Sequence, residues 1–132
     1  MRSARLVIAS PSLSVDEISS LMGCEPDAYR RKGEVRQGAR IPIPAADSTW
    51  ELRESVDGGT AIECALDALM NRIFPLENEL HRLSQTDCVL KLCLVQWISK
   101  ENEVGPGFSL GLEGIAFLAK IGAFLDVDQY VE

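Results

Sequence analysis

The sequence predicts an α+β fold: a two-layer α/β sandwich of ferredoxin-like kind, with split β-α-β units, a mostly antiparallel sheet and about three helices. Three observations predict it. Strand-like runs alternate with amphipathic helical runs along the chain. The length of 132 residues is that of one domain, which we place over residues 1–132. Near both ends, an extended run enters a short helix that closes on a glycine, Gly23 or Gly122.

The first predicted elements are a strand and a capped helix. Residues 5–10 (RLVIAS) are β-rich, which predicts a strand buried on both faces. Ser14 is followed three residues later by Glu17, which predicts a capping box at the start of a helix, and Gly23 is placed to end it. One face of this helix carries the apolar residues Val15, Ile18, Leu21 and Met22.

The next segment, residues 29–46, is the least regular part of the chain. Its alternation is poor, and Pro42 and Pro44 forbid a regular central strand. We therefore expect a ragged edge strand followed by an extended, polyproline-like loop. Residues 49–54 then alternate apolar with charged side chains, which predicts a half-exposed strand, and residues 57–59 (DGG) predict a turn.

The strongest helical signal begins after this turn. Thr60 and Glu63 predict a second capping box. Apolar residues then recur at spacings of four and three, at Ile62, Leu66, Leu69, Ile73, Leu76, Leu80 and Leu83. Because Pro75 removes one helical hydrogen bond, we expect a kink or short break near Phe74, with the same face buried on both sides.

The C-terminal part adds a buried strand and a last helix. Residues 88–98 are apolar at most positions, which predicts a central strand. A polar turn over residues 100–107 leads to a short strand predicted over residues 108–110. A helix follows over residues 113–121, and residues 124–131 predict a last strand with alternating acidic side chains.

Composition argues against several classes of function. The 13 Lys and Arg residues against 20 Asp and Glu give a net charge of -7, which opposes general binding to nucleic acid or to anionic membranes. No apolar run reaches the ~18 residues of a membrane span, and residues 1–5 lead into the first strand without a signal-peptide pattern. The cysteines form no C-x-x-C pair, which fits a reducing compartment. We expect a cytoplasmic protein without a cofactor or metal.

The charge is strongly polarised along the chain. Residues 30–40 hold five cations and one acid, a local charge of +4, so the remaining eight cations and 19 acids leave -11 elsewhere. One interpretation is an edge strand protected from aggregation by its charge. The other is recognition of an anionic group or an acidic patch on a partner. The candidate binding residues of this segment are Arg31, Lys32, Arg36 and Arg40.

The sequence contains no recognisable catalytic motif. The lone histidine, His81, shares a helix face with Glu77, but no third metal ligand has a suitable spacing, so a solvated surface is the plainer interpretation. Neither a G-x-S-x-G elbow nor a phosphate-binding glycine loop occurs. Trp50 and Trp97 are strand aromatics that suit either the core or an interface anchor. Carboxylates recur two residues apart at Glu101 and Glu103 and at Asp126 and Asp128.

Four motifs occur in an order that resembles a known family. They are LSVDEISSLMGCEP at residues 13–26, RRKGEVR at 30–36, STWEL at 48–52, and GFSLGLEGIAFLAKIGAFLDVDQY at 107–130. Together they resemble the bacterial family known as domain of unknown function 4279. The resemblance implies a bacterial, intracellular α+β domain and brings no established catalytic residues. The chain departs from the family pattern around Tyr29 and in its own prolyl stretch at residues 41–44.

We weigh three functions. The first is a non-enzymatic, immunity-type protein that masks the basic surface of a toxin nuclease, with Glu101, Glu103, Asp126 and Asp128 facing that partner. The second is a small-anion-binding domain that uses Lys32, Arg36 and Arg40 beside Trp50. The third is an enzyme whose site carries no recognisable motif. A homodimer is compatible with each of them.

Overall fold

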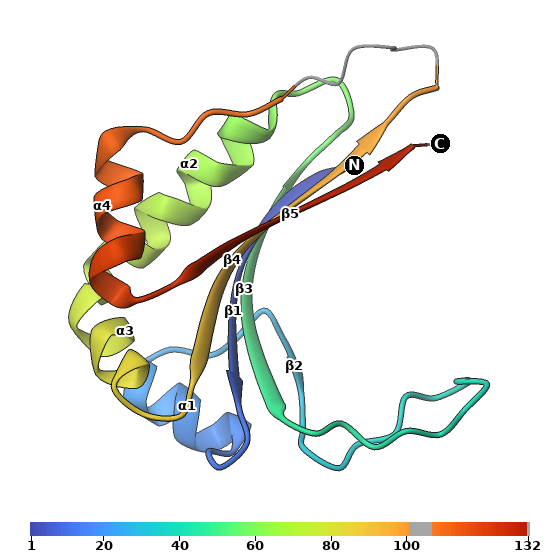
Figure 1. Ribbon diagram of the computed structural model, residues 1–132, viewed down its shortest axis with the longest axis vertical. Coiled ribbons are helices and arrows are strands. Elements are labelled where there is room, and N and C mark those ends of the chain that lie inside the picture. Colours follow the sequence, from blue (N-terminus) through green and yellow to red (C-terminus); the bar gives the residue numbers. More distant parts are fainter. Residues whose placement is uncertain (101–106, 132) are drawn as a thin grey trace.

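A five-stranded sheet covered on one face by helices forms the molecule (Figure 1). The computed structural model describes residues 1–100 and 107–131. Along the chain the elements are β1 (Arg2–Ser10), α1 (Val15–Met22), β2 (Ala28–Arg30), β3 (Ser48–Val56), α2 (Ile62–Ile73), a 3-10 turn η1 (Phe74–Leu76), α3 (Glu77–Ser84), β4 (Val89–Ile98), α4 (Leu112–Ile121) and β5 (Phe124–Val131). The predicted α+β class is confirmed.

The sheet order is β2-β3-β1-β4-β5. β1 is antiparallel to both β3 and β4, and β2 is antiparallel to β3, so β1-α1-β2 is a β-α-β unit split by β3. In the same way, β3 and β4 are parallel strands separated by β1, with α2 and α3 between them in the chain. This is the ferredoxin-like arrangement that the sequence predicts.

The second split unit differs from the one suggested by the similarity of the two chain ends. α4 leads to β5, which pairs directly with β4 in parallel, so β4, α4 and β5 form an ordinary β-α-β unit added to the edge of the sheet. The sequence similarity of the N-terminal and C-terminal segments shows only that each contains a helix between two strands. Which strands become neighbours is decided by long-range pairing.

The core lies between the sheet and the helices. In the cross-strand register Leu6 lies opposite Leu52 and Leu92, and all three side chains face the helix layer and are buried. The apolar stripe of the helical run continues through η1, where Pro75 lies, and Ile73 and Leu80 are fully buried on either side of it. The predicted break with one continuous buried face is therefore confirmed.

The other face of the sheet, here called the open face, is covered by none of the described helices (Figure 1). Side chains that point to it, such as Val7 on β1 and Lys91, Cys93 and Val95 on β4, are only partly buried. The prediction that residues 5–10 are buried on both faces is wrong for this reason. An apolar run shows that a strand is internal to a sheet, but it does not show that both faces of the sheet are covered.

The start and end of α1 follow the local sequence signals. The Ser14 hydroxyl accepts a hydrogen bond from the Glu17 amide at 3.0 Å, and the Glu17 carboxylate accepts one from the Ser14 amide at 3.2 Å. Gly23 ends the helix at φ 72°, a conformation that costs glycine little. Leu21 departs from the predicted stripe, because it is 52% exposed while Val15, Ile18 and Met22 are buried.

The second predicted capping box is wrong. α2 begins after Ala61 without a side-chain cap. The Thr60 hydroxyl instead donates to the Asp57 carboxylate at 2.9 Å, and the Glu63 carboxylate accepts a hydrogen bond from the Ser109 amide at 3.1 Å. Neither side chain therefore caps α2. Thr60 binds within the preceding turn, and Glu63 binds Ser109, which lies 46 residues away in the chain.

The predicted strand over residues 108–110 is also wrong. These residues have no regular secondary structure and pair with no described strand, and they lead directly into α4. α4 ends at Gly122, whose φ is 67°. Among the described helices, none has the length and apolar character that crossing a membrane requires.

Candidate functional site

Two charged surfaces lie at opposite edges of the sheet, and each contains part of the predicted set of binding residues. One is a hollow beside β2 and β3, here called the basic hollow, and the other is β5 with its two aspartates, here called the β5 edge. β1 and β4 separate β3 from β5. The two surfaces can therefore be altered independently.

The two tryptophans have different environments. Trp50 is fully buried under the helices, and its indole Nε1 donates to the Ser19 hydroxyl at 3.0 Å. Trp50 is thus corrected from a candidate binding residue to a core residue. Trp97 lies on the open face, is 42% exposed, and stacks on Tyr130 with ring centroids 4.7 Å apart. Alternation places a residue on one strand face, but only the tertiary structure shows which face is covered.

The cations of residues 30–40 do not form one site. Arg31 reaches Asp16 at 3.5 Å and lies over the Tyr29 ring, and the Lys32 ammonium donates to the Pro11 carbonyl at 2.8 Å. Arg40 lies on the exposed loop that follows. The predicted grouping of Lys32, Arg36 and Arg40 beside Trp50 is therefore not assembled, because Trp50 is in the core and Lys32 is bound to the turn after β1.

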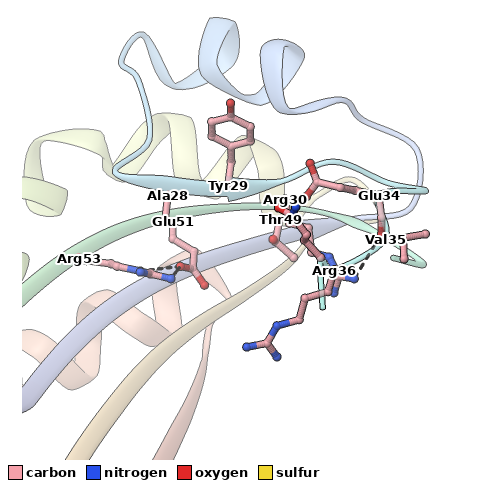
Figure 2. A pocket seen from close by; sticks show the side chains of 10 residues that line it. Ala28, Tyr29, Arg30, Glu34, Val35, Arg36, Thr49, Glu51 and Arg53 are labelled. Carbon is pink, nitrogen blue, oxygen red and sulfur yellow. Dashed lines mark hydrogen bonds and ion pairs between the residues drawn. The ribbon is translucent and has the colours of Figure 1, made fainter. Parts of the chain in front are cut away.

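The basic hollow has a volume of about 720 Å³ and is shown in Figure 2. Arg30 and Arg36 line it together with Arg53 of β3. The Arg30 guanidinium donates to the Glu34 carbonyl at 3.3 Å, and Arg53 donates through Nε to the Glu51 carboxylate at 2.7 Å. Arg36 has no ion pair within the described part of the chain, so its charge is available to a ligand.

Arg53 is a functional candidate that the sequence reasoning missed, and Arg30 belongs to the predicted basic segment without having been named as a candidate. Arg30 lies opposite Thr49 in the register of β2 and β3, and Glu51 and Arg53 follow Thr49 on the same face of β3. The alternation of residues 49–54 places these side chains on one face of a strand, but the pairing with Arg30 depends on the register. A loop-closing bridge between Val35 and Pro44 then brings Arg36 to the same hollow.

An ion-pair network holds the β2–β3 corner against α2. Arg72 of α2 donates to the carboxylates of Asp27 at 2.8 Å and Glu54 at 3.1 Å, and Asp27 also accepts from the Arg53 amide at 2.8 Å. The hydrogen bond from Arg72 lowers the pKa of Asp27 and outweighs the opposing effect of burial. The same hydrogen bond raises the pKa of Arg72. The network fixes the position of β3, and Arg53 of this strand lines the basic hollow.

The β5 edge carries two aspartates on the open face. Asp126 lies opposite Cys93 and Asp128 opposite Val95 in the register with β4. Within the described residues, neither carboxylate has an ion pair or a side-chain hydrogen bond. The strand register places both aspartates on the open face, so the prediction that they share a face is confirmed. Glu101 and Glu103, the other predicted acidic pair, lie outside the described residues.

The candidates for catalysis have structural roles or unfavourable pKa values. His81 Nδ1 lies 3.0 Å from the Lys120 carbonyl, and Glu77 pairs with the Lys120 ammonium at 3.0 Å, so both residues connect α3 to α4. Burial, with a smaller contribution from the Asp126 charge, raises the pKa of the Cys93 thiol and keeps it protonated at neutral pH. In the described part of the chain, no group of three or more His, Cys, Asp and Glu side chains could hold a metal ion.

A protein-family model described as a domain of unknown function, DUF4279, matches residues 1–132. The chain belongs to the DUF4279 family. Its membership confirms the resemblance seen in the four sequence motifs. Neither the search of curated proteins nor the search of solved structures found a match.

Proposed function

We propose that this DUF4279 chain is a non-enzymatic binding module for a protein partner with a basic surface, acting as an immunity-type protein that masks a toxin. One observation carries the proposal: Asp126 and Asp128 stand without a described partner on an exposed edge strand. Because unpaired carboxylates on a protein surface attract cations, this edge favours a partner that presents Lys or Arg.

The surroundings of the two aspartates support the same conclusion. Tyr130 follows them on the open face and stacks on Trp97 of β4, which leaves two half-exposed aromatic rings beside the carboxylates. Aromatic residues are enriched among those that contribute most to protein–protein affinity. With the net charge of -7, the surface combines long-range attraction of a basic partner with an anchor for close contact.

The test measures, by titration calorimetry at low and high salt, how tightly this chain binds the protein encoded by the gene next to its own, here called the adjacent gene product. The Asp126→Asn/Asp128→Asn variant is expected to weaken binding about tenfold or more at low salt, because both carboxylates are lost from the contact surface. High salt should reduce the affinity of the wild-type chain for the partner. It should also reduce the difference in affinity between the wild-type chain and the Asn variant.

A matched control removes two charges from the helical side. Glu25 and Asp67 are exposed and make no ion pair within the described residues, so Glu25→Gln/Asp67→Asn changes the net charge equally without touching β5. This control should bind within about twofold of wild type, since long-range attraction alone changes affinity little. Equal binding by the β5 variant and the control would contradict the proposal.

A second candidate function is supported by the basic hollow. Arg30 and Arg36 line it together, and two guanidinium groups at one hollow can bind a phosphate or carboxylate. Saturating inorganic phosphate or a nucleoside phosphate should then raise the melting temperature by about 4 °C or more. Arg36→Gln should abolish this rise, whereas Arg40→Gln, which removes the same charge from the neighbouring loop, should retain it. No rise with any anion would exclude this function.

A further inference from the structure

We propose that β5 is the site where an extended basic segment of the protein partner adds to the sheet as a further strand. This inference rests on the proposed function and names the way in which the partner binds. In strand addition, main-chain hydrogen bonds supply affinity and alternate side chains supply specificity. Three properties of β5 support this mode of binding: its free edge, its two different faces and its poor fit to a second copy.

β5 is a long edge strand. Among the strands that the structure describes, it pairs only with β4, its register runs without interruption from Phe124 to Val131, and all eight of its residues are exposed. Proteins usually protect such edges with charged side chains, above all lysine, or with prolines, bulges or short strands. β5 has no lysine, proline or bulge, and its two charged residues, Asp126 and Asp128, are both acidic, so they oppose an acidic strand and not a basic one. The opposite edge strand, β2, has only three residues. No described residue pairs with the outer backbone groups of β5, which can therefore accept another strand.

The two faces of β5 specify the chemistry of the added strand. On the open face Asp126 and Asp128 are flanked by Phe124 and Tyr130, as the register with β4 shows. The alternate side chains on the helix side are Leu125, Val127, Gln129 and Val131. Phe124 is 64% exposed and Val131 66% exposed, so both can contact apolar side chains of an added strand. A complementary strand would alternate apolar residues with Lys or Arg.

A second copy of the chain is a poor occupant of this edge. In an antiparallel pair of β5 strands, residues that lie opposite each other must point to the same face. The two registers with the largest overlap then place Asp126 opposite Asp128, or Asp128 opposite itself, across the symmetry axis. Like charges directly opposite each other destabilise a strand pair, whereas Lys or Arg at these positions stabilises it. The charge pattern therefore favours a basic partner.

The test uses a capped synthetic peptide in which valine alternates with lysine. A twin peptide carries N-methyl groups on alternate residues, so it keeps the side chains and charges but loses main-chain donors along one edge. We expect the unmodified peptide to bind at least tenfold more tightly than its twin. We also expect it to slow amide hydrogen exchange at alternate residues of β5 and not in β2.

Two protein variants complete the experiment. Asp126→Asn/Asp128→Asn should weaken binding of the unmodified peptide, whereas Glu25→Gln/Asp67→Asn should not. A third peptide that alternates valine with glutamate should not bind, because its carboxylates would lie opposite Asp126 and Asp128.

Several outcomes would overturn strand addition. Equal affinity of the two lysine peptides would show that charge alone drives binding, and strand addition would fall while the proposed function stands. If the adjacent gene product binds without slowing amide hydrogen exchange in β5, strand addition is likewise wrong while the proposed function stands. Sedimentation of the free chain as a dimer with protected β5 amides would make a second copy the occupant. If the adjacent gene product binds the Asn variant as tightly as wild type, the proposed function itself fails.

Discussion

Replacing Trp50 with alanine is expected to lower the free energy of unfolding by about 3–5 kcal/mol. The indole is fully buried on the central part of the sheet, where it lies between Ile8 of β1 and Tyr29 of β2 in the strand register. The variant leaves a cavity under α1 and removes the donor to the Ser19 hydroxyl, which is itself buried. Urea denaturation followed by circular dichroism measures the loss.

Trp97→Ala is the matched control, because it removes the other indole of the chain. Trp97 is half-exposed on the open face and loses mainly its stacking on Tyr130, so the expected cost is below about 1.5 kcal/mol. The remaining fluorescence of Trp97→Ala, which comes from Trp50, should be blue-shifted relative to that of Trp50→Ala. Equal destabilisation by the two substitutions would contradict the assignment of Trp50 to the core and Trp97 to the open face.

Leu80→Ala is expected to lower the free energy of unfolding by about 2–5 kcal/mol. Leu80 lies in α3, after the 3-10 turn that contains Pro75, and is fully buried. The substitution tests whether the helical run keeps one buried face on both sides of the proline. Urea denaturation at neutral pH gives the measurement.

Leu112→Ala removes the same side chain from an exposed position. Leu112 begins α4 and is 83% exposed, so its replacement should change stability by less than about 0.5 kcal/mol. If Leu80→Ala proved as mild as Leu112→Ala, α3 would not pack into the core as described.

The basic hollow and the β5 edge lie at opposite edges of one sheet, and this arrangement has a functional consequence. The +4 charge of residues 30–40 does not cancel the acidic charge of β5 locally, because β1 and β4 lie between β3 and β5. At physiological salt, exposed charges separated by more than about 8 Å are largely screened from each other. One molecule therefore presents a positively charged surface and a negatively charged surface at the same time.

Most predictions that depend on neighbouring residues agree with the structure. The Ser14–Glu17 capping box, the Gly23 and Gly122 helix ends and the break at Pro75 each arise from interactions within about one helical turn. Such signals depend only on nearby residues and not on how the rest of the chain folds. The capping box predicted at Thr60 and Glu63 is wrong because Asp57 and the distant Ser109 compete for the same side chains.

The candidate sites were less predictable from the sequence than the fold. Asp126 and Asp128 share a face because strand side chains alternate, and this much follows from their spacing. Arg30, Arg36 and Arg53 meet only through the register of β2 with β3 and the closed loop between them. No local pattern identifies such a group, since its members come from segments whose relative position is set by pairing.

By itself, the sequence determines the α+β class, most of the helices and strands, and the polarised charge of this chain. These properties follow from hydrophobic periodicity, capping and composition, which act over short distances or over the whole chain. Only the tertiary structure decides that α4 and β5 extend the sheet at β4, that one sheet face stays open, and that Trp50 is buried while Trp97 is not. Strand order, register and coverage depend on contacts between distant residues, because the same alternating strand can turn either face to the core.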